Sequence, residues 1–309
     1  MGGEARILTS NGAHPAGVAC MPLEFLAEIH QQGVEVMSVS RYLTIGVASL
    51  RRQVPVWSMG VVLALTGCGG SGADPAAAPV ELATVVTLDH GGFRLRYDCA
   101  ANTTLRFEYL LGTDTGQAAR TDLFTLNDPA LPAGCGQQLS AGSYWSVQPG
   151  WDRGHLVTAN HMDATDELMA ATFHMTNIVP QRSLLNQGIW QQTEEIAECH
   201  RDLAPVQVVG GVVYDDVAND HFVASHGIRT PDWFWKVLVT TDAAGAVQVI
   251  AWLIPNRDDL AGLDAYLVSV AELEARVGAG QVDLPGMSAA VKSGRPAVSW
   301  PLPTGCGLG

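Results

Sequence analysis

Two segments of the chain alternate apolar and charged residues with the period of a half-buried β-strand. They are residues 93–97 (FRLRY) and 105–109 (LRFEY), and a short polar turn separates them. Successive side chains of a strand point to opposite faces, so each segment offers one apolar face to a core and one charged face to water. This pattern predicts two antiparallel strands at the start of a sheet.

Further strands are predicted in the second half of the chain. Residues 206–214 form an apolar run typical of a buried strand. Residues 235–240 and 247–254 are strand-like on both sides of the turn sequence at 242–245 (DAAG), which predicts a hairpin.

One helix is marked at both ends. Ser269 and Glu272 have the spacing of a capping box, in which the serine and glutamate side chains bond the first amide groups of the helix, and Gly278 is expected to end it. Together, these elements predict one domain of α+β class, with a central antiparallel β-sheet flanked by helices.

A short apolar segment follows two arginines in the N-terminal quarter. Arg51 and Arg52 precede residues 54–65 (VPVWSMGVVLAL), and the segment ends in Leu-Thr-Gly-Cys at Cys68. This order is typical of a secretory signal peptide, and the run is too short to span a bilayer comfortably. The tetrapeptide resembles the bacterial lipobox, which implies that Cys68 is lipidated and becomes the first residue of the mature protein.

The chain is therefore predicted to have four parts. We interpret residues 1–36 as an upstream over-extension of the reading frame and residues 37–67 as a lipoprotein signal peptide. Residues 68–85, rich in Gly, Ala and Pro, form a flexible tether, and residues 86–309 form the folded domain. We expect an exported protein anchored to a membrane by its N-terminal lipid, located at the outer membrane, the periplasm or the cell surface.

The cysteines agree with export. Cys99, Cys135, Cys199 and Cys306 lie in the predicted domain without any CxxC pair, which excludes a zinc ribbon and a thioredoxin motif. Two disulfides in an oxidising compartment are the natural interpretation, and four buried thiols are the alternative. Four cysteines allow three pairings; we favour Cys99 with Cys135, the closest in sequence, and hence Cys199 with Cys306.

The net charge limits how the chain can bind nucleic acid. It has 17 basic and 31 acidic side chains, a formal net charge of −14. A field of this sign repels phosphate, which argues against broad electrostatic adhesion to nucleic acid or anionic lipid. Any phosphate chemistry must therefore be local, with a few arginines or a metal ion.

Polar residues accumulate between positions 151 and 195. Asn186, Trp190 and Glu194 are four residues apart, so on a helix they share one stripe, which could present an amide oxygen and a carboxylate to one cation. One amide, one carboxylate and several waters suit magnesium better than zinc.

Two basic residues precede that helix. Arg153 and His155 are two apart on an extended segment, so they face the same side, and a hairpin could return them beside Asn186. The imidazole could then take a proton from a water that attacks a phosphodiester, while the guanidinium holds a phosphate oxygen.

Each of these residues also has a purely structural interpretation. Residues 152–155 could form a turn with a surface ion pair, and Asn186 could be a helix N-cap. Trp190 is expected to pack in the core, and Glu194 with Glu195 could be a solvated pair. Only the three polar segments together favour a catalytic site.

Four histidines raise the question of a zinc site, but none has the helical HExxH pattern or a comparable ligand spacing. We interpret them as ordinary surface or core histidines. They are His161, His174, His221 and His226.

Several short motifs occur in an order and spacing that match one family. The specific matches are residues 152–155 (DRGH), 176–181 (TNIVPQ), 185–190 (LNQGIW) and Glu194; the looser ones are residues 233–236 (WFWK), 254–256 (IPN) and the helix at 269–278. With these motifs, roughly residues 90–280 resemble the DNA/RNA non-specific endonuclease family. These are endonuclease G-like, sugar-non-specific nucleases with a ββα-metal, or His-Me finger, active site.

The resemblance implies a metal-dependent phosphodiesterase that cuts DNA and RNA to leave 5′-phosphates. By the same resemblance His155 is the general base, Asn186 is the direct ligand of Mg²⁺, for which Mn²⁺ could substitute, and Glu194 holds metal-bound water. The protein's partners are then DNA and RNA as substrates, and a membrane only through the lipid anchor.

The resemblance also assigns supporting roles. Arg153 would stabilise the transition state and Asn177 would orient the site. A further upstream arginine is expected, for which Arg120 is the candidate. Phe173 departs from the family, since some members place a polar residue there.

Two other functions fit the same residues. One is a non-catalytic surface lipoprotein that binds nucleic acid or a partner on a nuclease-derived scaffold; such a scaffold should have lost the base, the ligand or the arginine, and all three are present. The other is a related phosphodiesterase with a different substrate, which a panel of duplex DNA, single strands, RNA and small diesters would separate.

Overall fold

A computed structural model describes residues 84–306 of the chain. The predicted over-extension, the signal peptide, Cys68 and nearly all of the tether lie outside the described residues, so these predictions stay predictions. Within residues 84–306, no helix is both long and apolar enough to cross a membrane.

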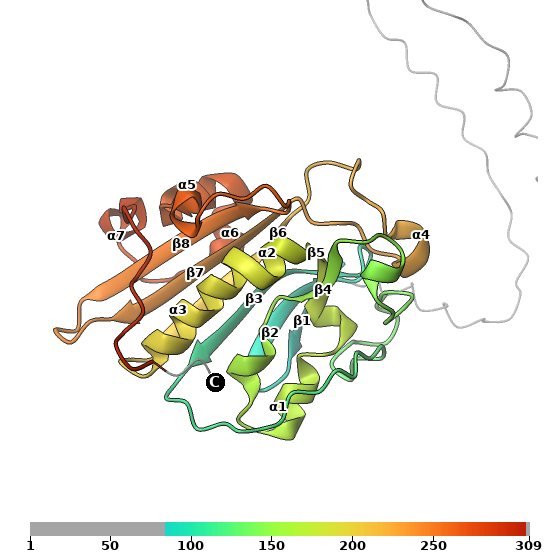
Figure 1. The fold of residues 1–309 in the computed structure, drawn as a ribbon, viewed down its shortest axis with the longest axis horizontal. Coiled ribbons are helices and arrows are strands. Elements are labelled where there is room, and N and C mark those ends of the chain that lie inside the picture. Colours follow the sequence, from blue (N-terminus) through green and yellow to red (C-terminus); the bar gives the residue numbers. More distant parts are fainter. Residues whose placement is uncertain (1–83, 307–309) are drawn as a thin grey trace, which may run out of the picture. The chain divides into compact units, whose positions relative to one another are not determined.

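An antiparallel sheet of seven strands forms the centre of the domain, in the order β1-β2-β3-β6-β7-β8-β9 (Figure 1). Every neighbouring pair runs antiparallel, which confirms the predicted fold class. The strands are β1 (Val85–Asp89), β2 (Phe93–Asp98), β3 (Thr103–Leu111), β6 (Val206–Val213), β7 (Trp233–Thr241), β8 (Val247–Pro255) and β9 (Leu267–Val268).

The predicted strands and their turns are present. The alternating segments at 93–97 and 105–109 lie in β2 and β3, and the hairpin of β7 and β8 turns at 242–245. The capping box is also formed: Ser269 caps α5 (Val270–Val277), and Gly278 ends it with a φ of 91°. These local patterns survive because each agrees with the packing around it.

The sheet is covered on both faces. Along β7, Phe234 and Leu238 belong to a large core shared with the helices and strands of the middle of the chain, whereas Trp235 and Val237 pack against α5 and its neighbour α6 (Ala279–Val282). Alternation along a strand therefore assigns each residue to one of two cores. Three further short α-helices are α1 (Asp166–Ala171), α4 (Val223–His226) and α7 (Ala289–Ser293).

A second, two-stranded sheet lies on the first of these faces and leads into a helix. Strands β4 (Trp151–His155) and β5 (Ile178–Arg182) are antiparallel, and β5 continues directly into one helical run. This run comprises α2 (Ser183–Leu185), the π-turn η5 (Asn186–Trp190) and α3 (Gln191–Arg201). The arrangement is a ββα unit, and in Figure 1 α3 lies alongside β3.

Both expected disulfides are formed. Cys99 pairs with Cys135, and Cys199 pairs with Cys306. The second bond ties the C-terminal segment to α3, because Cys199 lies in the last two turns of that helix. The alternative of four buried thiols is therefore wrong for this structure.

Gly210 in the central strand β6 provides a test of the packing. A Cβ atom there would lie 2.2 Å from the Phe107 ring and 2.8 Å from the Trp235 carbonyl oxygen. We expect Gly210→Ala to lower the free energy of unfolding by about 1–3 kcal/mol, because an overpacked core must shift its backbone. Gly262→Ala, where the added methyl group meets nothing within 4 Å, is the control. Urea unfolding measures both, and equal midpoints would contradict the packing.

Candidate active site

A polar cavity of about 540 Å³ opens where the ββα unit meets the loop before it. Its lining combines arginines and histidines with carboxylates and amides. Of the residues predicted from the sequence, His155, Arg153, Arg120, Asn186 and Glu194 all line this one cavity, and Asn177 does not. The other lining residues are Phe124, Thr158, Asn160, His161, Gln187, Gln191, Glu195 and Glu198.

His155 is the last residue of β4 and is held by aromatic rings. Its imidazole lies with its centroid 4.8 Å from that of Phe173 and 5.5 Å from that of Phe124. The Nε2 atom is buried and has no hydrogen-bond partner among the described residues. The preceding residue is Gly154, where a Cβ atom would lie 2.3 Å from the Gln181 side chain of the paired strand. A larger residue would therefore clash at this position.

The surroundings of His155 favour the neutral imidazole. Burial lowers its pKa to about 3, and the nearby charges of Arg120 and Arg153 act in the same direction. A neutral ring can accept a proton at one nitrogen, which is the state that a general base requires at neutral pH.

Two arginines lie beside the imidazole. Arg153 is fixed by two contacts: its guanidinium carbon lies 3.6 Å from the centroid of the Phe124 ring, and Nη1 donates to the Ala141 carbonyl oxygen at 2.9 Å. Arg120 comes from the upstream loop and lies over the Phe173 ring at 5.3 Å. The two guanidinium groups form a local cationic patch on an otherwise acidic protein.

Asn177 is fully buried behind the cavity. Its Oδ1 accepts from the Val157 amide at 2.9 Å, and its Nδ2 donates to the carbonyl oxygens of Val157 and Thr172 at 2.8 and 2.9 Å. The side chain therefore fixes the backbone that follows His155, which is a geometry suited to the predicted orienting role.

Asn186 is oriented by a carboxylate. Its Nδ2 donates to Asp152 Oδ2 at 3.0 Å, and the same carboxylate accepts from Ser183 Oγ and from Gln187 Nε2. This bond identifies the amide nitrogen, so Oδ1 is the atom that remains for a cation. The alternative of a helix N-cap is wrong, because Asn186 lies inside the helical run and has helical φ and ψ of −56° and −50°.

The helix is not regular between Asn186 and Glu194. A π-turn interrupts it at Gly188, whose φ and ψ are −120° and −113°. Asn186 and Glu194 still line the same cavity, whereas Trp190 between them is buried in the core, as expected from its size. Glu194 is also not a solvated partner of Glu195: burial raises its pKa, and the charge of Lys236 partly offsets this.

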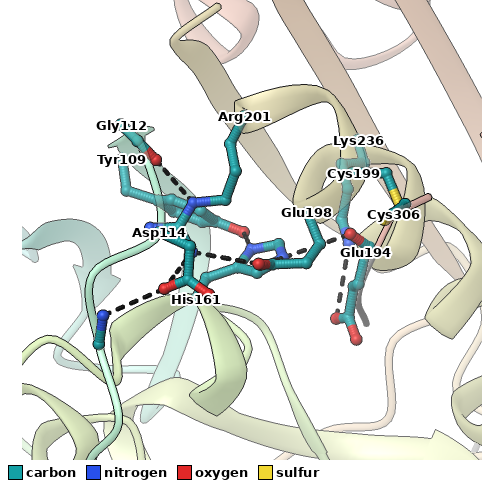
Figure 2. A network of polar contacts seen from close by, with 11 residues as sticks. Tyr109, Gly112, Asp114, His161, Glu194, Glu198, Cys199, Arg201, Lys236 and Cys306 are labelled. Carbon is teal, nitrogen blue, oxygen red and sulfur yellow. Dashed lines mark hydrogen bonds and ion pairs between the residues drawn. A yellow bond between two sulfur atoms is a disulfide. The ribbon is translucent and has the colours of Figure 1, made fainter. Parts of the chain in front are cut away.

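Sequence reasoning missed the part played by His161, which belongs to a buried polar network under α3 (Figure 2). Its Nδ1 lies 2.9 Å from the Tyr109 hydroxyl, and its Nε2 lies 3.3 Å from the carbonyl oxygen of Glu194. Arg201 closes the network by donating to the Gly112 carbonyl oxygen and pairing with Glu198. These contacts attach α3 to β3, and no local sequence pattern marks them.

Asn256 was also missed, although it lies in the loosely matched motif at 254–256. It is buried at the end of β8, where its Oδ1 accepts from the Arg182 amide and its Nδ2 donates to the carbonyl oxygens of Pro180 and Pro231. One amide side chain thus joins β5 of the ββα unit to the main sheet.

The other three histidines that were considered as zinc ligands do not share a site. His174 Nδ1 lies 2.9 Å from the Thr125 hydroxyl, His221 packs on the Trp151 ring, and His226 Nδ1 lies 2.9 Å from the Ser225 hydroxyl. None of the three lines the cavity.

Comparison with protein families gives one match over most of the chain. Residues 77–285 match the model of the DNA/RNA non-specific endonuclease family. Among curated relatives, a nuclease of Nostoc sp. (strain PCC 7120) is 32% identical over 176 residues, which cover 53% of this chain and 60% of that protein. The mitochondrial nuclease EXOG of Danio rerio is 27% identical over 176 residues, with 53% of this chain and 50% of the relative covered.

A solved structure is similar as well. The crystal structure of the EndoG/EndoGI complex matches with a TM-score of 0.52 and 19% identity, covering 62% of this chain and 83% of that one. At this identity the match shows the fold, which agrees with the predicted ββα-metal architecture. The chain spans about half the length of curated relatives such as EXOG.

The low pKa of His155 gives a prediction for stability. Between pH 6.5 and 4 the unfolded chain binds a proton at this histidine that the folded chain does not, so acidification favours unfolding. Relative to His155→Gln, the wild type should lose up to about 1.4 kcal/mol of unfolding free energy per pH unit in this window. Urea unfolding at several pH values measures both proteins, and parallel curves would contradict a buried neutral imidazole.

Proposed function

Because this chain belongs to the DNA/RNA non-specific endonuclease family, we propose that its polar cavity hydrolyses the phosphodiester bonds of DNA and RNA and leaves 5′-phosphates. The observation that carries the proposal is the gathering of His155, Arg153, Asn186 and Glu194, from three separate sequence motifs, around one cavity. A degenerate scaffold has no reason to keep all four groups together.

In this proposal His155 is the general base. The neutral imidazole, which lines the cavity, takes a proton from the water that attacks phosphorus, while the bond from phosphorus to the 3′ oxygen breaks and the phosphate stays on the 5′ oxygen. Arg153 and Arg120 face the same cavity and stabilise the negative charge that grows on the phosphate oxygens. Asn177 holds the backbone at Val157, two residues after His155.

The site fits a hard divalent cation. Among residues 84–306, no three His, Cys, Asp or Glu side chains are grouped so that they could hold a metal ion. The donors present are the Asn186 amide oxygen, oriented by Asp152, and the Glu194 carboxylate, which would act through water. One direct oxygen ligand with several retained waters suits Mg²⁺, or Mn²⁺ in its place, better than zinc. When bound, the ion would stabilise the charge on the leaving oxygen.

Low sequence specificity follows from the same cavity. The two arginines that line it and the proposed cation site would contact phosphate, and phosphate contacts carry no base information. With a net charge of −14, the rest of the protein adds no general attraction for nucleic acid. DNA and RNA with an accessible backbone are therefore the proposed substrates.

We also propose that the protein is exported and anchored through Cys68, at the outer membrane, in the periplasm or on the cell surface. The signal-like segment and the lipobox-like tetrapeptide support this. The two disulfides of the domain agree with an oxidising compartment.

Degradation of plasmid DNA and RNA tests the nuclease. We expect the chain from residue 69 onward to cleave both with Mg²⁺ and to be inactive in EDTA. His155→Ala should lower the rate by at least about 100-fold, because general-base catalysis contributes on the order of 10²–10⁴. His221→Ala, outside the cavity, is the control and should keep the wild-type rate. A folded wild type that cleaves nothing with any divalent metal would instead favour a non-catalytic binding scaffold.

Membrane fractionation tests the anchor. In bacterial cells that process lipoproteins, the wild type should incorporate labelled palmitate and sediment with membranes. Cys68→Ala should abolish both, because it removes the thiol that carries the lipid. Cys20→Ala is the matched control, since that cysteine lies within the predicted over-extension. Palmitate incorporation that survives in Cys68→Ala would overturn the proposal.

A further inference from the structure

Lys236 is a lysine in the middle of a sheet that is covered on both faces. It lies in β7 between two paired strands, opposite Gly210 of β6 and Trp252 of β8. Its side chain is only 1% exposed. Lysine is almost never buried to this extent without an ionic partner, so this position requires an explanation.

The partner of Lys236 is in the candidate active site. Alternation along β7 places Lys236 on the face of Phe234 and Leu238, which is the face under α3. Its Nζ lies 3.6 Å from Oε1 of Glu194 and 3.8 Å from the centroid of the Trp190 ring. Figure 2 shows the ammonium group next to the glutamate, below the helix.

The contact between Lys236 and Glu194 is not expected to stabilise the fold. Nζ has no hydrogen-bond partner within ordinary distance among the described residues, so a desolvated ammonium group is held by charge and by the face of an indole ring. Burying an ion pair costs more solvation than its attraction returns unless hydrogen bonds satisfy it, and an apolar side chain would fit such a position better. A stable core alone does not require lysine here.

Glu194 is held at its main chain as well. The Nε2 atom of His161 lies 3.3 Å from the Glu194 carbonyl oxygen, from the side of β3 and η3 (Ala159–Met162). Lys236 contacts the carboxylate of Glu194, and His161 contacts its main-chain carbonyl oxygen. The residue is therefore held both at its backbone and at the tip of its side chain.

We propose that Lys236 is a positioning residue for the reaction, which fixes the Glu194 carboxylate against the cavity by a buried ion pair. This inference rests on the proposed function, in which Glu194 acts toward the cation. Lys236 itself does not line the cavity and touches no substrate. The structure thus assigns to the loosely matched WFWK segment a role in the site, through its lysine.

A double-mutant cycle in the full-length protein tests the proposal. Lys236→Met keeps the length of the side chain and removes its charge, and we expect kcat at saturating Mg²⁺ and substrate to fall about ten-fold or more with KM nearly unchanged. In a Glu194→Gln background the same change should alter kcat less than two-fold, because the group that Lys236 positions is already gone. Lys236→Gln, which retains an amide donor, is the milder second variant and should lose less.

A measurement without metal or substrate accompanies the kinetics. In EDTA, each single variant leaves one buried charge unpaired, so the double variant Glu194→Gln/Lys236→Met should unfold at a higher urea concentration than either single variant. Arg106→Met is the matched control, because Arg106 is 4% exposed and pairs with Glu108 outside the cavity. It should lower stability and leave kcat as in the wild type.

The outcomes separate the two proposals. A wild type that cleaves while Lys236→Met keeps full kcat, or an equal loss of kcat in both backgrounds, would overturn the positioning role and leave the nuclease intact. A double variant less stable than both single variants would contradict the ion pair itself. If the wild type cleaves nothing, the proposed function fails and the positioning role fails with it, whatever the unfolding cycle shows.

Discussion

The antiparallel pairing of β4 with β5 determines where Arg153 and His155 lie relative to the helix that carries Asn186 and Glu194. In its register Asp152 is opposite Gln181 and His155 is opposite Ile178, and β5 runs without a break into the helical segment 183–201. Hydrogen bonds between the two strands therefore bring His155 close to a helix that lies about 30 residues later in the chain. A slip of one residue would turn His155 to the other face of the pair, away from Asn186.

The cavity brings charged groups of both signs together within a small volume. Burial and the nearby charges of Arg120 and Arg153 keep His155 neutral, and Asn186 and Glu194 are the groups proposed to act toward a cation. These groups are partly withdrawn from water, and electrostatic interactions are stronger there than in solvent. Removal from water also makes an unpaired charge costly. The buried Lys236 beneath Glu194 therefore points to a role that depends on its charge.

Attachment of the ββα unit to the main sheet uses polar contacts rather than apolar packing alone. Asn256 joins β5 to the end of β8, and the network of Tyr109, His161 and Arg201 joins α3 to β3. The Cys199–Cys306 bond adds a covalent tie at the other end of α3. With these ties α3, which carries Glu194, keeps its position relative to the sheet.

The sequence by itself determined the strands, the hairpin, the capped helix and the fold class, because period-two alternation, turn residues and a capping box depend on a few neighbouring residues. It also identified five of the groups that line the cavity: four belong to the motifs of the family resemblance, and Arg120 was the candidate for an upstream arginine that the same resemblance implies. Only the tertiary structure decided that Asn186 is oriented by Asp152, that a π-turn lies between Asn186 and Glu194, and that Lys236 lies beneath the carboxylate. These facts depend on contacts between segments far apart in sequence, whose distances and burial are set by packing and not by any local pattern.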